Sequence, residues 1–420
     1  MTATVSAPLQ TPPVVCTSCG LLCDDLPGPA SDHDLAAWSA HLQALCPQAA
    51  RGIAAAADDG GGALIDGVPV PFEVAVVAAA RRLNGARRAV VGGLGGDVQA
   101  TRAALALADR IGARVVHGQQ FVMQHGQFAQ QSRGAITTTL AEARNRAELL
   151  VIVGGDPTRR FPRLLERLLV AEPPFVKVAA RRVLLLAAPP PARMPVGTLV
   201  EAVDCGGLDL FDSIAVLRAH LGGRPAPLAG DLAQLAARLQ ECAYGVLIWS
   251  GRDVDCAGGD LLVEQLNQLV VDLNRRTRWA ALPLGGSAGD ITANAVAGWQ
   301  TGFSLPVEFA AGKVRYDPFP DYADADLLFW VASLAGVGPP GLPGVSGLPL
   351  VVVGAPSVAA ALPPEHVFLP TATPGVGSSG HLVRCDAVIT LYAPAVLKTA
   401  LPSAASVIDA VAGAIEGMRS

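Results

Sequence analysis

The stretch "ELLVIVGGDP", residues 148–157, decides the fold class. Its aliphatic residues follow one another without a polar side chain and end at Gly154 and Gly155. A short run that is apolar at every position predicts a strand buried on both faces, which is typical of parallel sheets in α/β proteins. The glycine pair predicts a tight turn at the carboxyl end of that strand.

Strands of this kind alternate with amphipathic helices along most of the chain. This alternation predicts doubly wound α/β sheets behind a small N-terminal domain, because each helix must bury its apolar stripe against a sheet. The expected helices span residues 72–85, 98–112, 140–147, 232–242, 259–277 and 403–417, and the expected strands lie within 87–96, 113–118, 148–157, 244–253, 325–334, 348–358, 366–375 and 387–394.

The composition favours a densely buried protein, or one that covers its surface with partner subunits. Of 420 residues, 51% are hydrophobic and only 16% are charged, and the mean hydropathy is +0.40. The net charge of −5 comes with no basic stripe, which argues against nucleic-acid binding. The N-terminus does not resemble a signal peptide, and the apolar runs are too short or too interrupted to span a membrane. We therefore expect a cytoplasmic protein.

Two glycine-rich turns follow predicted strands, "VVGGLGG" at 90–96 and "VIVGGDP" at 151–157. Doubly wound sheets place ligands at such turns. Neither turn is a complete G-x-G-x-x-G fingerprint or a phosphate-binding Walker loop. Ordinary turn chemistry and an ancestral cofactor cleft both remain open for these two segments.

The strongest local motif is a group of cysteines near the N-terminus. "CTSCGLLCDD" places Cys16, Cys19 and Cys23 at C-x2-C-x3-C spacing, and Cys46 follows. Such a trio with a later fourth cysteine suits a tetrahedral metal centre, and soft thiolates suit an iron–sulfur cluster or zinc. The alternative is a set of buried free thiols. The other cysteines are scattered, and we expect them to be core thiols: Cys205, Cys242, Cys256 and Cys385.

Several of these segments together resemble the B subunit of formylmethanofuran dehydrogenase, a member of the molybdopterin oxidoreductases. They are "CTSCGLLCDDL" (16–26), "GAITTTLAEARNRAELLVIVGGDPTRRFPR" (134–163), "WQTGF" (299–303) and "HVFLPTATPGVGSSGHLVRCD" (366–386). The resemblance implies a formate dehydrogenase-like α/β fold with one split domain. The implied ranges are a cysteine-rich domain at 1–65, the first half of an α/β domain at 66–180, an inserted α/β domain at 181–340 and the return of the first domain at 341–420.

The resemblance also implies an active site that this chain has lost. The family would hold tungsten or molybdenum with two pterin dithiolenes and one cysteine or selenocysteine. That cysteine position falls on Gln124, and the family's arginine and histidine near the metal fall on Gly285 and Ser287. A carboxamide is a poor substitute for a thiolate on such a metal. We therefore predict a degenerate pocket, no catalytic residue in this chain and no tungstopterin or molybdopterin.

These departures favour the non-redox relative of the family, the B subunit of a formyltransferase/hydrolase complex. The resemblance implies that this complex passes a formyl group from tetrahydromethanopterin to a methanofuran-like carrier and hydrolyses it to formate. An amidohydrolase-like A subunit, a C subunit and a formyltransferase D subunit would be the partners. A [4Fe-4S] cluster at the cysteines either persists or has been lost.

Two other interpretations remain open. The chain is a catalytic subunit of a tungsten or molybdenum formylmethanofuran dehydrogenase with an unusual ligand, or an unrelated α/β protein with a zinc or cluster knuckle. Next to Gln124, His125 precedes Gly126 at the end of a connection, and we expect it to be a hydrogen-bonded residue and not a catalyst. An arginine-rich region either binds the acidic tail of the carrier or forms a solvated helix face; its members are Arg133, Arg144, Arg146, Arg159, Arg160 and Arg163.

Overall fold

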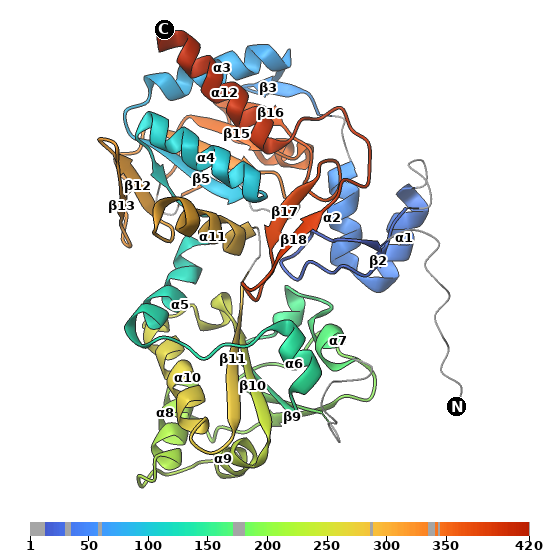
Figure 1. Cartoon of the computed structure of the whole chain (residues 1–420), viewed down its shortest axis with the longest axis vertical. Helices are drawn as coiled ribbons and strands as arrows, with labels where there is room; N and C mark the ends of the chain where they lie inside the picture. The colour runs from blue at the N-terminus through green and yellow to red at the C-terminus, as the bar shows by residue number, and fades with distance from the viewer. Residues whose placement is uncertain are drawn as a thin grey trace. The chain divides into compact units, whose positions relative to one another are not determined.

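The chain folds into two compact α/β units. A computed structural model describes residues 13–29, 35–57, 61–170, 181–285, 289–334, 341–342 and 345–419. The larger unit combines Met1–Gln120 with Gly286–Ser420, and the smaller unit is Phe121–Gly285. Figure 1 shows the elements of both units.

The larger unit contains a nine-stranded sheet with the order β13-β12-β6-β5-β14-β15-β16-β3-β4. The five strands from β6 to β16 in that order run parallel to one another, and the strands at both ends are antiparallel to their neighbours. The bounds are β3 (Ala63–Ile65), β4 (Val68–Val70), β5 (Ala89–Gly95), β6 (Arg114–Val115), β12 (Val307–Ala310), β13 (Lys313–Tyr316), β14 (Leu327–Ala332), β15 (Leu350–Gly354) and β16 (His366–Pro370).

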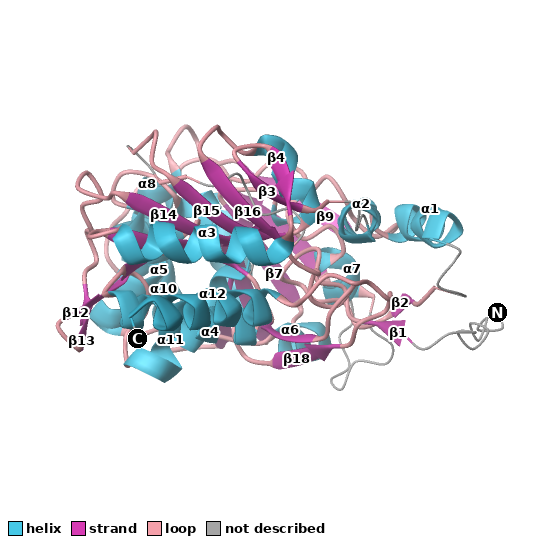
Figure 2. Cartoon of the chain, turned by 90° about the horizontal axis from the view of Figure 1, so that it is seen from above, coloured by secondary structure: helices cyan, strands magenta, loops and turns pink. Residues whose placement is uncertain are grey.

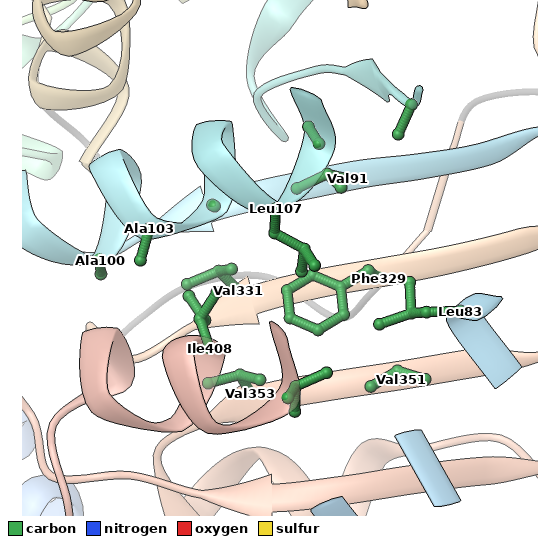
Figure 3. Packing of buried hydrophobic residues seen from close by; sticks show 14 of the residues in the cluster. Leu83, Val91, Ala100, Ala103, Leu107, Phe329, Val331, Val351, Val353 and Ile408 are labelled. Atoms are coloured by element: carbon green, nitrogen blue, oxygen red, sulfur yellow. The ribbon is translucent and has the colours of Figure 1, made fainter. Parts of the chain in front are cut away.

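Helices cover one face of this sheet. Figure 2 shows them in a row, and the bounds are α3 (Phe72–Gly85), α4 (Val98–Ile111), α11 (Asp290–Thr301) and α12 (Ala404–Arg419). Leu83, Leu107 and Ile408 from these helices pack on Phe329 and Val353 of the sheet (Figure 3). Side chains on the opposite face of the sheet, such as that of Phe368, pack against connecting segments and against a 3-10 helix at Pro356–Ala361. In the described residues this sheet is therefore layered with helices on one side, not doubly wound as expected.

The smaller unit is doubly wound, as the sequence predicts. Its five strands are all parallel and follow the order β11-β10-β7-β8-β9. Helices α6 and α7 lie on one side of the sheet and α8 and α10 on the other (Figure 1). The bounds are β7 (Leu149–Val153), β8 (Arg182–Leu186), β9 (Leu199–Val203), β10 (Tyr244–Ser250), β11 (Arg278–Leu284), α5 (Gln120–Arg133), α6 (Leu140–Arg146), α7 (Leu164–Leu169), α8 (Leu210–Leu221), α9 (Leu232–Glu241) and α10 (Gly259–Leu273).

The N-terminal head contains two helices that the expected elements did not include. It holds the strands β1 (Pro13–Val14) and β2 (Leu26–Pro27) and the helices α1 (Leu35–Leu45) and α2 (Pro47–Ala57). Helix α2 starts with a proline in its first position and continues with alanines, and both features favour a helix. Near the other end of the chain, β17 (Gly380–Val383) and β18 (Thr390–Ala393) form a separate hairpin.

The structure divides the chain at points that differ from the sequence-based ranges 66–180 and 181–340. Strand β7 belongs to the same sheet as β8 and β10, so the smaller unit begins before residue 149. Strand β14 lies between β5 and β15 in the larger sheet, so the return to the larger unit comes before residue 327. The segment of β8 is absent from the expected strands, although four of its five residues are buried.

Glycines within the strands make room for indole rings. Gly245 of β10 pairs with Trp279 of β11, and a Cβ atom on Gly245 would lie 2.3 Å from that ring. The Trp279 side chain is fully buried and donates its Nε1 hydrogen to the carbonyl oxygen of Leu239 at 2.9 Å. The ring therefore cannot retreat without breaking this hydrogen bond, which would leave a buried polar group unsatisfied.

We predict that Gly245→Ala lowers the free energy of unfolding by about 1–3 kcal/mol, because the added methyl overpacks the Trp279 ring. Urea unfolding followed by tryptophan fluorescence measures this change. Gly298→Ala is the matched control, since a Cβ on this α11 residue would meet nothing within 4 Å. The control should stabilise the chain by about 0.5–1 kcal/mol. Equal effects of the two substitutions would contradict the packing argument.

Candidate functional site

The smaller unit has a topological switch point between β7 and β10. From β7 the chain continues to β8 and β9 on one side of the sheet, and later enters β10 and β11 on the other side. Open α/β sheets bind ligands at the carboxyl ends of the strands that flank such a point. The turn at Gly154 and Gly155 and the turn that starts at Gly251 therefore form the first candidate site.

The side chain of Asp253 fills the turn after β7. A Cβ atom on Gly155 would lie 2.2 Å from Oδ1 of Asp253, and one on Gly154 would lie 2.6 Å from the Asp253 carbonyl oxygen. The N–H and O–H of Ser250 donate to Oδ2 of Asp253 at 3.0 and 2.7 Å. Arg160 donates to the Ser250 hydroxyl at 3.0 Å. The glycine pair that the sequence marked as a possible cofactor turn thus accommodates a carboxylate of the chain itself.

The adjacent Asp156 has a structural role. Its Oδ1 accepts hydrogen bonds from the backbone N–H and the hydroxyl of Thr158 at 2.8 and 2.6 Å, and its Oδ2 accepts one from the N–H of Ala192 at 2.8 Å. Its side chain is 1% exposed. The carboxylate therefore caps the short 3-10 turn after β7 and fastens the segment that follows β8.

Gln124 and His125 lie in helix α5, not at the end of a connection as the sequence suggested. The side chain of Gln124 is buried. His125 places its Nε2 atom 3.3 Å from Oδ1 of Asp255. Its ring also lies on Gly259 at the start of α10, where a Cβ atom would come within 2.8 Å of the ring. His125 thus has the hydrogen-bond partner that we expected, and it fills the space over the first residue of a helix.

Of the other two positions predicted for the degenerate pocket, only one is described. Gly285 follows β11 directly, and Ser287 lies outside the described residues. Gln124, His125 and Gly285 belong to the smaller unit. Gln124 and His125 therefore lie on helix α5, and Gly285, which follows β11, has no side chain that could carry a positive charge.

The larger unit has its own switch point, between β5 and β14, and protein groups occupy it too. The Trp330 ring covers Gly93, where a Cβ atom would lie 2.6 Å from it. Asp97 caps α4 by accepting a hydrogen bond from the N–H of Ala100 at 2.9 Å. Burial raises the pKa of Asp97. Hydrogen bonds from backbone N–H groups, including that of His381 in the hairpin, lower the pKa but do not outweigh burial. This carboxylate stands where a helix N-terminus would otherwise attract a ligand anion.

The cysteine loop, residues 16–23 of the larger unit, has a further thiol beside it, that of Cys385. The N–H of Cys16 donates to the carbonyl oxygen of Cys23 at 2.8 Å, and the N–H of Cys385 donates to that of Gly20 at 2.7 Å. Burial raises the pKa of Cys19 well above its usual value, and the nearby thiols of Cys16, Cys23 and Cys385 raise it further. Cys385 is a buried thiol, as expected, but its position beside the loop was not foreseen because more than 350 residues separate them.

Cys46 lies between α1 and α2. Its N–H donates to the carbonyl oxygen of Leu42 at 2.6 Å, and its residue is 6% exposed. Gln48 links this corner to the loop by donating to the carbonyl oxygen of Ser18 at 3.0 Å. Among the residues that the structure describes, no three histidine, cysteine or acidic side chains are arranged to hold a metal ion.

Apolar side chains close the space beneath the cysteine loop. Leu22, Leu334, Leu382 and Ala393 form a buried cluster there. The remaining cavity, between the loop at 17–22 and these residues, has a volume of about 10 Å³. A single water molecule needs at least roughly that much room, so the cavity does not admit a larger ligand.

The smaller unit also has a polar hollow of about 410 Å³ at the C-terminal ends of α8 and α10. No motif of the sequence pointed to it. Two pairs of its polar side chains bind each other: Arg276 donates to Gln240 at 2.6 Å, and Arg275 lies 3.5 Å from Asp272. Arginines near helix C-termini also offset the helix dipole. The structure thus gives these side chains a role in stabilising the helices.

Most of the arginines that were considered for an acidic tail have partners within the chain. Arg133 pairs with Glu264 at 2.7 Å, Arg146 with Glu142 at 3.7 Å and Arg159 with Asp156 at 3.7 Å. Arg163 pairs with Glu166 at 2.5 Å, and Arg160 binds Ser250. These contacts favour the interpretation of a solvated, internally paired surface.

Comparison with known proteins identifies the family. No family model matches the sequence. The B subunit of the formyltransferase/hydrolase complex Fhc from Methylorubrum extorquens is 32% identical over 344 residues, which is 79% of this chain and 91% of that relative. The chain belongs to the Fhc B-subunit family.

More distant relatives agree with this assignment. The B subunit of the tungsten-containing formylmethanofuran dehydrogenase 2 of Methanocaldococcus jannaschii is 24% identical over 403 residues, 89% of this chain and 91% of that relative. A chain in the crystal structure of the formyltransferase/hydrolase complex FhcABCD from Methylorubrum extorquens, solved with methylofuran, superposes with a TM-score of 0.73 and 29% identity. That match covers 86% of this chain and 100% of the other. The resemblance drawn from the motifs is confirmed, and an unrelated α/β protein is excluded.

Cys256 is exposed, so the expectation of a core thiol was wrong for this residue. We predict that iodoacetamide at pH 8 modifies Cys256 first, because the reagent reaches an exposed thiol and reacts with its thiolate form. Burial and the charge of Glu148 raise the pKa of Cys242 to about 12. Its thiolate fraction at pH 8 is then roughly 10⁻⁴. Mass spectrometry of tryptic peptides measures the order of modification, with Cys256→Ser as the control. Faster labelling of Cys385 than of Cys256 in the folded chain would contradict the buried position of Cys385.

Proposed function

We propose that this chain is a structural, redox-inactive B subunit of a formyltransferase/hydrolase complex. The observation that carries the proposal is its membership of the Fhc B-subunit family together with Gln124 and Gly285 at positions where the redox relatives would need a thiolate and a cation. Ser287, where the redox relatives would have a histidine, is the third such position.

The chemistry of these residues does not fit a tungsten or molybdenum pterin centre. A carboxamide is neutral at physiological pH and is a hard donor, so Gln124 cannot replace a soft anionic thiolate. Gly285 cannot hold the charge of a one-carbon anion, because charge-assisted contacts need a cationic side chain. Ser287 cannot carry a proton near neutral pH as histidine does. His125, which the relatives would share, is packed on Gly259 and paired with Asp255.

In this proposal the other subunits perform the chemistry. A formyltransferase D subunit transfers the formyl group from tetrahydromethanopterin to a methanofuran-like carrier, and an amidohydrolase-like A subunit hydrolyses it to formate, with a C subunit completing the assembly. The matched crystal structure is that of the complex FhcABCD with methylofuran, which supports this assignment. The low charged fraction of 16% also fits a chain that buries surface against partners.

The same kinship supports a molybdopterin oxidoreductase-like arrangement of the chain, with a cysteine-rich domain at residues 1–65 and one α/β domain interrupted by the other. A cytoplasmic location is part of this proposal. In the described part of the chain, no helix combines the length and the apolar character that a bilayer crossing requires.

The cysteine loop is the part of the proposal that concerns a cofactor. Thiolates are suitable donors for zinc or a [4Fe-4S] cluster. We retain Cys16, Cys19, Cys23 and Cys46 as the proposed ligands in the assembled complex, because the first three lie on one loop and Gln48 ties the corner that holds Cys46 to it. No step of the proposed function depends on a metal at these cysteines.

The second candidate function is that of a catalytic tungsten or molybdenum formylmethanofuran dehydrogenase subunit. The retention of the four cysteines favours it, since a cluster serves to relay electrons in such enzymes. The relatives of this kind are 24% and 23% identical, below the 32% of the Fhc relative. The residues at 124 and 285 argue against it.

We predict that the intact complex, purified from its native host, contains neither tungsten nor molybdenum and does not oxidise formate with a viologen dye. Elemental analysis by mass spectrometry and an anaerobic viologen assay measure these two properties. Stoichiometric tungsten or molybdenum with viologen reduction would overturn the proposal. Iron or zinc in the same sample, lost in a Cys16→Ala and Cys19→Ala double variant, would support the proposed ligands.

We also predict that Gln124→Met leaves formyl transfer and hydrolysis by the complex within about 2-fold of the wild type, because Gln124 takes no part in the chemistry. The substitution keeps the side-chain length but removes the amide, and a buried partner left without its hydrogen bond costs about 1–3 kcal/mol of stability. Turnover per folded complex and thermal unfolding are measured side by side. A loss of turnover above 10-fold with normal assembly would contradict a silent pocket.

A further inference from the structure

The groups around Asp253 form a compact anion site within the smaller unit. Ser250 provides a backbone N–H and a hydroxyl to Oδ2, at 3.0 and 2.7 Å. The guanidinium of Arg160 adds a positive charge through its 3.0 Å hydrogen bond to the same hydroxyl. The glycine at 155 leaves open the space that Oδ1 of Asp253 takes. A cation, two donors and a missing Cβ are the elements that α/β proteins use to hold a ligand anion.

This cluster lies where open α/β sheets bind ligands. It is at the carboxyl ends of β7 and β10, the two strands that flank the switch point of the five-stranded sheet. The carboxylate reaches it from the 3-10 turn Gly251–Val254, directly after β10. Because the carboxylate is attached to the chain, its local concentration at the site exceeds that of any dissolved competitor.

We propose that the Asp253 carboxylate is the resident anion of this switch point, and that it keeps the site closed to external anions. Truncation of the side chain to alanine should open a site for a small monocarboxylate. Formate and acetate would take the position of the lost carboxylate, with Ser250 and Arg160 as their partners. This inference does not depend on the proposed function of the complex.

The first test is chemical rescue in the full-length chain. Asp253→Ala should unfold at least about 3 °C below the wild type, because it loses the charge-assisted hydrogen bonds from the N–H and the hydroxyl of Ser250. Addition of 100 mM sodium acetate or sodium formate should restore at least half of that loss. Sodium chloride at the same ionic strength should not, and none of these salts should act on the wild type beyond the chloride effect.

Two control variants make the test specific. Asp253→Asn fills the same volume without the charge, so it should be destabilised and should not respond to acetate. Asp255→Ala removes a neighbouring carboxylate that is 45% exposed, and acetate should not rescue it beyond chloride. Equal responses to acetate and chloride in Asp253→Ala, or an unfolding temperature within 1 °C of the wild type, would overturn the proposal.

A second measurement applies even if Asp253→Ala does not fold. Ser250→Ala, Asp253→Asn and the double variant form a thermodynamic cycle in urea unfolding. If the carboxylate is held as an anion by Ser250, the double variant should lose clearly less stability than the sum of the two single losses. Strict additivity would show that Asp253 is not held in this site and would reject the inference.

Discussion

Burial of both faces of the central parallel strands is the constraint on which the rest of the structure depends. Every residue of β5, β7, β10, β14, β15 and β16 is buried. Their backbone groups are satisfied by the neighbouring strands, because water does not reach them. Polar side chains can then gather only at the strand ends, where the turns reach solvent. The carboxyl ends of β5 and β7 accordingly collect the charged groups of Asp97, Asp156 and Asp253.

This constraint has opposite consequences in a cofactor enzyme and in a scaffold. In a cofactor enzyme the polar groups at the strand ends bind a ligand and remain incomplete without it. In this chain Asp97 caps α4 and Asp253 binds Ser250, so each switch point is completed from within. Leucines fill the space beneath the cysteine loop in the same way. These internal contacts at both switch points support the proposal that this chain is a structural subunit.

Much of the fold followed from local patterns. The run at 149–153 and the similar runs at 244–250 and 327–332 are strands, as their uniform apolar character predicted. The segment at 182–186 is not among the expected strands. It is short and is followed by prolines, and its burial depends on pairing with β7 and β9. The nine-stranded sheet was expected to carry helices on both faces. Which face a helix covers is decided by how the chain crosses the sheet, and periodicity does not contain that information.

For the site, the sequence by itself determined the chemical identities: a carboxamide at 124, no side chain at 285, a histidine at 125 and thiols at 16, 19, 23 and 46. These identities settle what a residue can donate, accept or ionise, because that depends on its functional group. Only the tertiary structure decided which groups meet. It placed Cys385 beside the loop at 16–23 and Cys46 at the corner between α1 and α2, and it put Asp253 on the glycines at 154 and 155. These contacts join residues that are far apart in the chain. They depend on the order of strands in a sheet, which no local sequence pattern encodes.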